Sequence, residues 1–324
     1  MSDTHTQRTR LAPSPTGALH LGNARTFLVN WAIARRERWS IVLRVEDLDG
    51  PRVKPEAIEG VCRTLAWLGI DWDTGPLVQS QDLGPCREAM GQLARAGRAY
   101  PSAVSRAEVE SAASAPHPGD HEVWFGPQLR PAGWGAGRSF EDTGTAWRFV
   151  VPEGPEARVG FVDRFAGAQG VDVGGTVGDF VIWTRRGVPA YQLAVVVDDH
   201  RQGVTRVIRG DDLISSAGRQ LLLWRALGLG PEPEYWHLPL VVGPDGRRLA
   251  KRHGDTRVDR YRGLGVPAEA VVGLCAWWCG MTPERRLMSA REFAAGLDVS
   301  MMPRAATVMG MEDEAWLHGC ASRR

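Results

Sequence analysis

The residues with the clearest chemical potential lie near the N-terminus, in the run RLAPSPTGALHLGNART from Arg10 to Thr26. An extended stretch leads there into a loop of Pro and Gly and then into the start of a helix. Such a junction directs backbone N–H groups and the positive end of the helix dipole outward, which suits a phosphate group. Gly17 and Gly22 would let the backbone come close to that group, and His20 could donate a hydrogen bond from its imidazole. A single histidine at a helix start is also a common structural feature, so this run alone does not decide the function.

These residues need a scaffold, and the hydrophobic pattern indicates one. Extended stretches at 8–12 and 41–45 alternate with helical patterns at 23–38, 55–68 and 85–96. Strands that alternate with helices are typical of a parallel α/β sheet. The first hundred residues therefore have the outline of half a nucleotide-binding domain.

The character of the chain changes after residue 100, where clusters of Gly and Pro separate short strand-like pieces such as 146–151. We interpret residues 100–178 as an insertion. Beyond it the α/β pattern resumes, with a strand at 180–184, a β-rich run at 191–197, a strand at 205–208 and a helix at 213–227. Helical patterns at 266–278 and 290–297 follow. The predicted units are 1–99 and 179–255 for the two halves of a core, 100–178 for the insertion and 256–324 for a short helical region.

Composition adds few constraints. Lys and Arg number 39 against 38 Asp and Glu in 324 residues, so the net charge of +1 gives no global argument for a nucleic-acid partner. The five cysteines contain no C-x-x-C pair, which favours a reducing compartment. Cys275 and Cys279 are expected to share one buried helix face. No apolar run approaches the roughly 18 residues that span a bilayer, and the first ten residues lack a signal-peptide pattern, so we expect a cytoplasmic protein.

Further motifs narrow the function. The runs RVEDLD at 44–49, AYQLAVVVDDH at 190–200, VIRGDD at 207–212 and RLAKRHG at 248–254 follow the N-terminal run in order. Together they resemble the catalytic core of the class I glutamyl-tRNA synthetases. HLGN at 20–23 is similar to the HIGH signature of that family, and RLAKR at 248–252 to its KMSKS signature with Ala250 in place of Ser. The resemblance covers about residues 8–255. It implies an α/β fold, a Rossmann-like synthetase core with an inserted α+β subdomain and a short helical C-terminal region.

The resemblance also implies an activity and a site. Enzymes of this type join glutamate to the α-phosphate of ATP and pass the glutamyl group to a hydroxyl, mostly by positioning and charge neutralisation. Arg10 would pair with the glutamate side-chain carboxylate through a bidentate contact, and Glu46 would hold the ammonium group. The implied glutamate site is completed by Ala12, Ser14, Tyr191 and Arg209. Taken one at a time, these charged residues could equally be ordinary surface or ion-pair residues.

ATP would be bound by residues of the two signatures, with Mg²⁺ accompanying it. The implied set is His20, Gly22, Asn23, Arg248 and Lys251, of which His20 and Lys251 would be catalytic. Lys251 lies in a Gly- and Arg-rich loop, where a compact cation could follow charge developing on the phosphates. A solvated basic loop is the alternative, and the missing hydroxyl at Ala250 gives that alternative some weight.

Only 73 residues follow Lys251, fewer than the anticodon-binding domains of full-length family members. The resemblance therefore favours a truncated branch that attaches glutamate to the queuosine base of tRNA(Asp), acting as a monomer. The alternatives are a paralogue that charges the tRNA 3′ end and a non-catalytic module that binds glutamate or RNA. Candidate RNA contacts are the basic clusters at 35–38, 185–186 and 247–252.

The insertion departs from that branch, which often carries a zinc site beginning Y-x-C-x-C. The corresponding run here is YPSAVSR at 100–106, without cysteine. Zinc needs thiolate or imidazole ligands at such spacing, so we expect no structural zinc and no metal ligands in the chain. His117 and His121 are expected to be solvated. A local core of Tyr100, Val104, Val123 and Trp124 is predicted instead.

Overall fold

A computed structural model of the chain describes residues 7–15, 19–48, 55–103, 124–247, 249 and 255–321. Its centre is a five-stranded parallel sheet in the order β10-β9-β1-β2-β3. The strands are β1 (Arg8–Leu11), β2 (Ser40–Val45), β3 (Thr74–Val78), β9 (Arg206–Gly210) and β10 (Glu234–Leu238). The carboxyl ends of parallel strands meet at one edge of a sheet, which is where such folds bind ligands.

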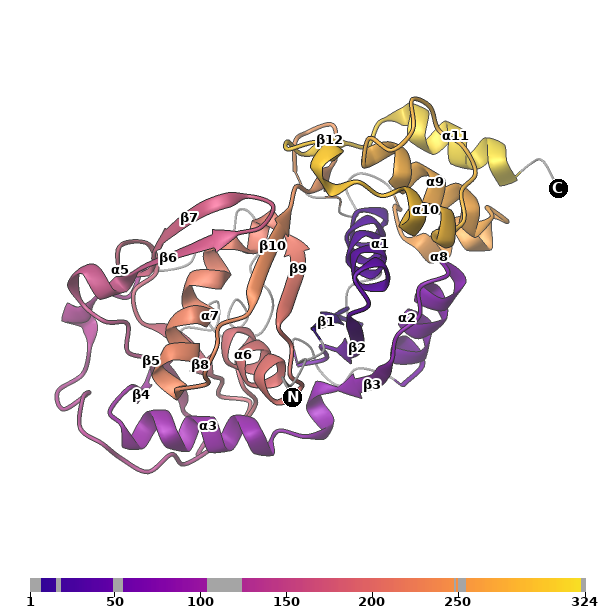
Figure 1. Cartoon of the computed structure of the whole chain (residues 1–324). Helices are drawn as coiled ribbons and strands as arrows, with labels where there is room; N and C mark the ends of the chain where they lie inside the picture. The colour runs from indigo at the N-terminus through magenta and orange to yellow at the C-terminus, as the bar shows by residue number, and fades with distance from the viewer. Residues whose placement is uncertain are drawn as a thin grey trace, which may run out of the picture.

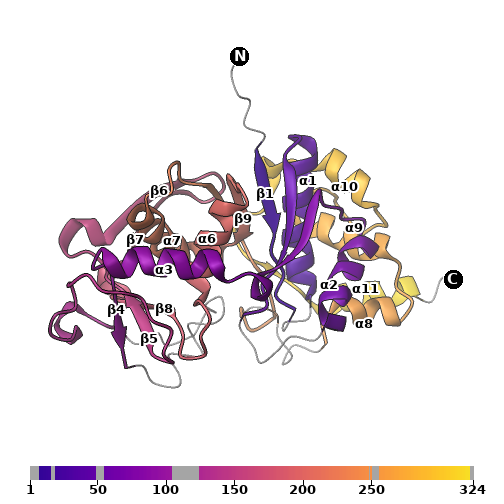
Figure 2. The same ribbon diagram turned by 90° about the horizontal axis from the view of Figure 1, so that it is seen from below.

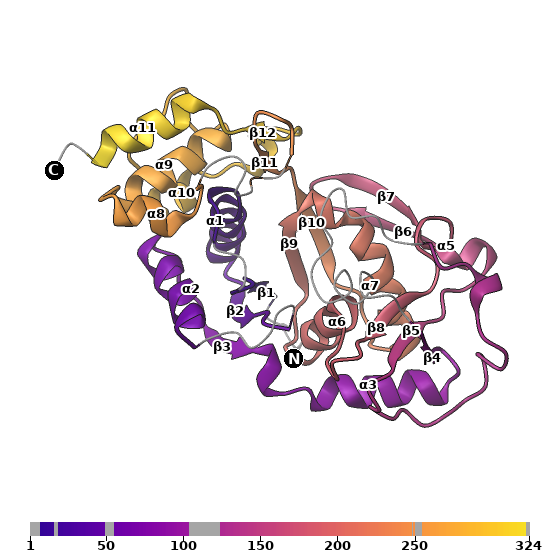
Figure 3. The same ribbon diagram turned by 180° about the vertical axis from the view of Figure 1, so that it is seen from behind.

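One side of this sheet is covered by helices from both ends of the chain. They are α1 (Leu21–Arg36), α2 (Pro55–Trp67), α8 (Val258–Gly263), α9 (Ala268–Trp278), α10 (Ala290–Gly296) and α11 (Met311–Ala321). The C-terminal helices gather around α1 in Figure 1, and the view from behind in Figure 3 shows α2 beside α8. A short sheet of β11 (Val241–Val242) and β12 (Thr307–Val308) lies beside them. Leu28, Val271 and Phe293 belong to one buried apolar cluster there, so the C-terminal region shares the core of the first half.

The other side of the molecule holds α3 (Gly84–Arg95), α6 (Tyr191–Arg201), α7 (Ile214–Leu227) and the insertion. The insertion and the residues next to it in the chain form two antiparallel sheets. One is formed by β4 (Ala99–Ser102), β5 (Ala146–Phe149) and β8 (Phe180–Trp183), and the other by β6 (Arg158–Asp163) and β7 (Gly167–Asp172), which is followed by the short helix α5 (Val173–Thr176). Figure 2 shows α3 running along this side, away from β1 and β2. A second apolar cluster, including Leu193, Ala217 and Trp147, joins α6 and α7 to the insertion.

Most of the predicted elements are confirmed. Strands at β1, β2 and β9 and helices at α1, α2, α3, α7, α9 and α10 lie within a few residues of the predicted ranges. Cys275 and Cys279 are both buried, as their shared helix face indicated. Two strands of the parallel sheet, β3 and β10, were not predicted. No described helix is both long and apolar enough to cross a membrane.

Two predictions about the second half of the core are wrong. The strand at 180–184 exists, but as β8 it pairs antiparallel with β5 rather than entering the parallel sheet. The run at 191–197, expected to be β-rich because of its three valines, is the helix α6. Every residue from Gln192 to Asp199 is buried there, and a helix buried on all sides shows no apolar stripe that would distinguish it from a strand.

A buried carboxylate organises the insertion instead of the apolar core that we expected. Tyr100 is fully buried, but Trp124 is 42% exposed, and Val104 and Val123 lie outside the described residues. Asp179 accepts hydrogen bonds from Tyr100 Oη at 2.8 Å, from Arg130 Nε and Nη2 at 2.8 and 3.0 Å, and from the Val151 amide at 2.9 Å. In the described ranges no three His, Cys, Asp or Glu residues are grouped to hold a metal ion, and His117 and His121 lie outside those ranges.

Replacing Asp179 tests this hub. In Asp179→Ala, the Nε–H of Arg130 and the hydroxyl of Tyr100 lose their acceptor in a buried site, and we expect the free energy of unfolding to fall by about 3–5 kcal/mol. Chemical denaturation measures this change. The matched control is Glu153→Ala. Glu153 is the other carboxylate that pairs with Arg130, and its side chain is 66% exposed, so its loss should lower the free energy of unfolding by no more than about 1 kcal/mol. Equal losses in the two variants would contradict a hub at Asp179.

Candidate active site

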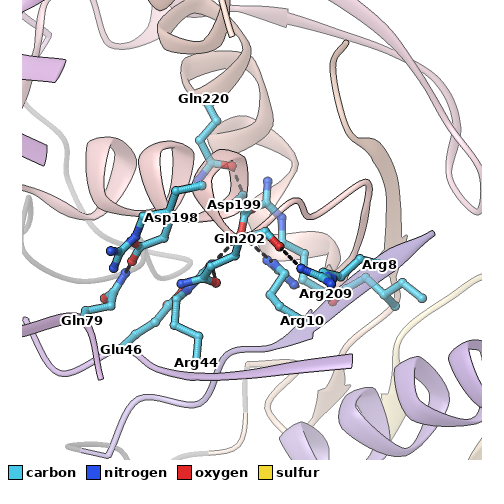
Figure 4. Close-up of polar contacts among 12 residues, drawn as sticks. Arg8, Arg10, Arg44, Glu46, Gln79, Asp198, Asp199, Gln202, Arg209 and Gln220 are labelled. Carbon is cyan, nitrogen blue, oxygen red and sulfur yellow. Dashed lines mark hydrogen bonds and ion pairs between the residues drawn. The ribbon is translucent and has the colours of Figure 1, made fainter. Parts of the chain in front are cut away.

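Buried charged side chains gather at the carboxyl edge of the parallel sheet. Arg10 lies near the end of β1, Arg44 near the end of β2 and Arg209 near the end of β9, while Glu46 follows β2 directly. Helix α6 contributes Asp199 from across the sheet. Figure 4 shows these five side chains directed toward one another between the strands and α6. The sequence-predicted residues Arg10, Glu46 and Arg209 are therefore brought together by the fold.

Arg44 connects the strand side of this cluster to α6. Its Nη1 donates to Asp199 Oδ1 at 2.6 Å and to Gln202 Oε1 at 3.0 Å. Its Nη2 and Nε donate to Glu46 Oε1 at 3.0 and 3.2 Å. Burial alone would lower the pKa of Arg44, but the charges of Asp199 and Glu46 outweigh it and raise the pKa above its ordinary value. Arg44 is thus a permanent cation that fixes the position of Glu46.

Arg10 is buried but only partly paired. Its Nε lies 3.4 Å from Asp199 Oδ1 without forming a hydrogen bond, and its Nη1 donates weakly to the Ile208 carbonyl at 3.4 Å. Burial lowers the pKa of Arg10, and Asp199 opposes that effect. The strand itself is tied to α1, because Asn30 Nδ2 donates to the Arg10 carbonyl at 3.0 Å. A buried guanidinium with so few good hydrogen bonds is suited to an incoming carboxylate.

The charged side chains of the cluster also act on the pKa values of Glu46 and Tyr191. Burial raises the pKa of Glu46, with Arg44 and Arg10 acting in the opposite direction. Tyr191, the first residue of α6, has its pKa raised by burial, and the charges acting on it are those of Arg209, Glu46, Arg10 and Asp199. The predicted hydroxyl is therefore within electrostatic reach of four charged groups of the cluster. Ala12 and Ser14 lie half-buried in the segment directly after β1.

Arg209 is held by the protein through each of its nitrogens. Nη1 donates to Gln220 Oε1 at 2.9 Å, Nε to His237 Nε2 at 3.0 Å and Nη2 to the Leu213 carbonyl at 3.2 Å. Three of the five guanidinium N–H groups are committed in this way, which leaves one on each terminal nitrogen for a ligand.

The start of α1 forms the neighbouring part of the site. His20 is the N-cap residue of α1, and its Nδ1 lies 3.0 Å from Thr256 Oγ1. The Leu21 amide donates to the Thr256 carbonyl at 3.1 Å. A Cβ on Gly22 would lie 3.4 Å from Val241 Cβ and 3.8 Å from Leu249 Cδ1. The segments before and after the predicted Lys251 loop therefore pack against the helix start that carries His20, Gly22 and Asn23.

Several predicted residues lie outside the described ranges, namely Gly17, Arg248, Ala250 and Lys251. Of the basic clusters, Arg35 pairs with Asp71 and Asp73, and Arg186 donates to the Leu48 carbonyl at 3.1 Å. Both side chains therefore make contacts within the protein itself.

Sequence reasoning missed Arg44, Asp199 and Gln202. Asp199 follows the run 191–197 that was expected to be β-rich, and because that run is the helix α6, Asp199 lies in the cluster beside Arg44. Arg44 could have been found, since residues two apart on a strand share a face and Arg44 precedes Glu46 by two.

The site offers a cation at Arg10, a second cation at Arg209 and a carboxylate at Glu46, and the N-terminus of α1 lies beside them. A zwitterionic amino acid with a second carboxylate would match the charged groups, and the helix start would suit an adjacent phosphate.

Comparisons with known proteins agree with this chemistry. The family described as tRNA synthetases class I (E and Q), catalytic domain, matches residues 6–315. A Rhodopirellula baltica protein named Glutamyl-Q tRNA(Asp) synthetase is 46% identical over 286 residues, covering 85% of both chains. A Symbiobacterium thermophilum protein of the same name is 42% identical over 322 residues, covering 96% of this chain and 98% of the relative. The structure of a glutamate tRNA ligase from Elizabethkingia meningosepticum, in complex with its amino acid, has a TM-score of 0.75 at 25% identity, covering 96% of this chain and 68% of that chain.

The role of Arg44 can be tested by Arg44→Lys, which keeps the charge but loses the planar fork that reaches Glu46, Asp199 and Gln202 together. We expect the free energy of unfolding to fall by about 2–3 kcal/mol, because charge-assisted hydrogen bonds of about 1.5–3 kcal/mol each are lost. The control is Arg63→Lys in the exposed pair with Glu59, which should change stability by less than about 0.5 kcal/mol. An R44K variant as stable as the wild type in urea unfolding would be inconsistent with this bridging role.

Proposed function

Because the chain belongs to the class I tRNA synthetases of the glutamate and glutamine type, we propose that it activates L-glutamate with ATP and transfers the glutamyl group to queuosine in tRNA(Asp). Membership of the family makes it an ATP-dependent ligase. The observation that carries the choice of glutamate is the convergence of Arg10, Glu46 and Arg209, whose charges act on one another at Arg10. Two cations and one anion match the two carboxylates and one ammonium group of this amino acid.

Within this pocket Arg10 would pair with the glutamate side-chain carboxylate, and Glu46 would accept the ammonium group. Tyr191 and Arg209 would lie toward the α-carboxylate end, with Ala12 and Ser14 forming the floor. Since Arg44 holds Glu46 and Asp199 in place before substrate arrives, little reorganisation is needed on binding.

Activation forms one bond and breaks one. An α-carboxylate oxygen of glutamate attacks the α-phosphorus of ATP, and the bond to pyrophosphate breaks. The queuosine hydroxyl then attacks the carbonyl carbon of glutamyl-adenylate, loses its proton and displaces AMP. The N-terminus of α1 with His20, Gly22 and Asn23 would bind the phosphates, and Arg248 and Lys251 would neutralise the departing pyrophosphate. Mg²⁺ would enter on the triphosphate oxygens, because the described residues offer no cluster of acidic ligands of their own.

The choice of queuosine as acceptor is supported by the relatives. Those named Glutamyl-Q tRNA(Asp) synthetase match this chain at 41–46% identity over 85–98% of their own length. A Parasynechococcus marenigrum protein named Glutamate--tRNA ligase matches at 36% over 67% of its length. Charging of the tRNA 3′ end and a non-catalytic binding role are the outcomes that the following experiments would reveal.

Glutamate-dependent exchange between ATP and pyrophosphate, without tRNA, measures activation directly. Arg10→Lys should raise the KM for glutamate by about tenfold or more, since a bidentate carboxylate contact becomes a single one, and should leave the KM for ATP unchanged. Arg35→Lys, in a pair on the exposed surface, serves as the control and should behave like the wild type. Wild-type kinetics in R10K would refute the assignment of Arg10, and no exchange at all would support a non-catalytic module.

The acceptor is tested with radiolabelled glutamate, ATP and two forms of tRNA(Asp), with and without queuosine. We expect label only on the queuosine-containing form, and after ribonuclease digestion only on the anticodon fragment. Equal labelling of both forms, or label on the terminal adenosine, would establish the 3′ end as the acceptor and overturn the proposal.

A further inference from the structure

A chain of buried polar contacts runs from the insertion to the pocket. Asp163, at the end of β6, lies 2.6 Å through Oδ2 from His237 Nδ1. His237, on β10, receives the Nε–H of Arg209 at its Nε2 at 3.0 Å. His237 and Arg209 are direct partners in the register of β10 and β9. Asp163, His237 and Arg209 are 2%, 0% and 5% exposed, so water does not compete for these contacts.

The protonation state of His237 follows from its two partners. A guanidinium can only donate, so Nε2 must carry a lone pair and the ring proton must lie on Nδ1, where it is donated to Asp163. The backbone fixes Asp163 in turn, because its carboxylate accepts from the amides of His237 at 3.1 Å, Phe165 at 2.9 Å and Ala166 at 2.7 Å. The imidazole also stacks on Tyr235, with ring centroids 5.7 Å apart and an interplanar angle of 12°.

From this geometry we propose that His237 is a positioning residue for glutamate, which orients the Arg209 guanidinium through Nε2 and is itself held in the required tautomer by Asp163 of the insertion. The inference rests on the proposed function, because Arg209 is the group that would meet the substrate. With Nε fixed by His237, the two remaining N–H groups of Arg209 keep one direction. Loss of the acceptor at Nε2 would let the guanidinium rotate and would leave Nε unsatisfied in a buried site.

Electrostatics keeps the ring neutral. The pKa of His237 is lowered to about 4, mainly by burial. The positive charges of Arg209 and Arg10 also lower this pKa, and Asp163 raises it. Among the described residues, these three groups, on β9, β1 and β6, have the largest charge effects on the ring. Because this folded-state pKa lies below the ordinary value near 6.5, the acceptor at Nε2 is present throughout pH 8 to 5.5. Below that pH range, a protonated His237 would carry a proton on Nε2, which would face the Nε–H of Arg209. The hydrogen bond between the two side chains would then be lost.

Two amide substitutions separate the two contacts. The side-chain oxygen of Gln in His237→Gln reaches the place of Nε2 and can still accept from Arg209. The amide nitrogen of Asn in His237→Asn reaches the place of Nδ1 and can still donate to Asp163. In glutamate-dependent exchange we expect H237N to raise the KM for glutamate by about tenfold or more, and H237Q by no more than about threefold, with the KM for ATP unchanged in both. Phe161→Leu, which alters packing beside the ring without removing a polar contact, should match the wild type.

Equal effects of H237N and H237Q on glutamate, or an equal rise in the KM for ATP, would assign His237 a general structural role and overturn the proposal. A second measurement needs neither the variants nor activity. Nitrogen-15 NMR of the histidine-labelled protein should show His237 with its proton on Nδ1 and no titration from pH 8 to 5.5. A proton on Nε2, or titration near pH 6.5, would refute the relay. Absence of exchange in the wild type would instead count against the proposed function, so the two failures are distinguishable.

Discussion

The buried pairing of Arg44 with Asp199 is the interaction on which the site depends. Their atoms are 2.6 Å apart, and both side chains are almost completely removed from water. Burying charge is costly unless each group is paired, so the same contact that holds α6 to the sheet also fixes Glu46 and places Arg10 beside Asp199. Three guanidinium groups, Arg10, Arg44 and Arg209, face two carboxylates in this cluster. A ligand that brings a net negative charge therefore completes an arrangement that the protein alone leaves positive.

The scaffold explains why these groups meet. β1 occupies the middle of the parallel sheet, with β2 on one side and β9 on the other, so their carboxyl ends deliver Arg10, Arg44 and Arg209 to one edge. Helix α6 packs beside this edge of the sheet and adds Asp199 to the cluster. The helix α1 that follows β1 turns its N-terminus toward the same edge and is pinned there by Thr256. The proposed glutamate site and the proposed phosphate-binding helix start would consequently lie next to each other.

The insertion contributes more than a connection between two halves of the core. Asp179 binds its strands together through Tyr100 and Arg130, and Asp163 reaches back to His237 beneath Arg209. The insertion therefore has its own buried hydrogen bonds and a direct hydrogen-bonded link to Arg209 through His237. This link gives a physical reason to expect the insertion to affect glutamate binding under the proposed function.

The sequence by itself determined many of the local elements, because periodicity located β1, α1, β2, α2 and α3. The resemblance of the motifs singled out Arg10, Glu46, Tyr191 and Arg209 as the residues of the proposed glutamate site. Only the tertiary structure decided that 191–201 is a helix, because a segment buried on every side carries no periodic signal. It also decided the pairing of Arg44 with Asp199, 155 positions apart, and the placing of His237 beside Arg209. Such contacts depend on which strands become neighbours, and β10 and α6 acquire their neighbours only when the chain closes around the insertion.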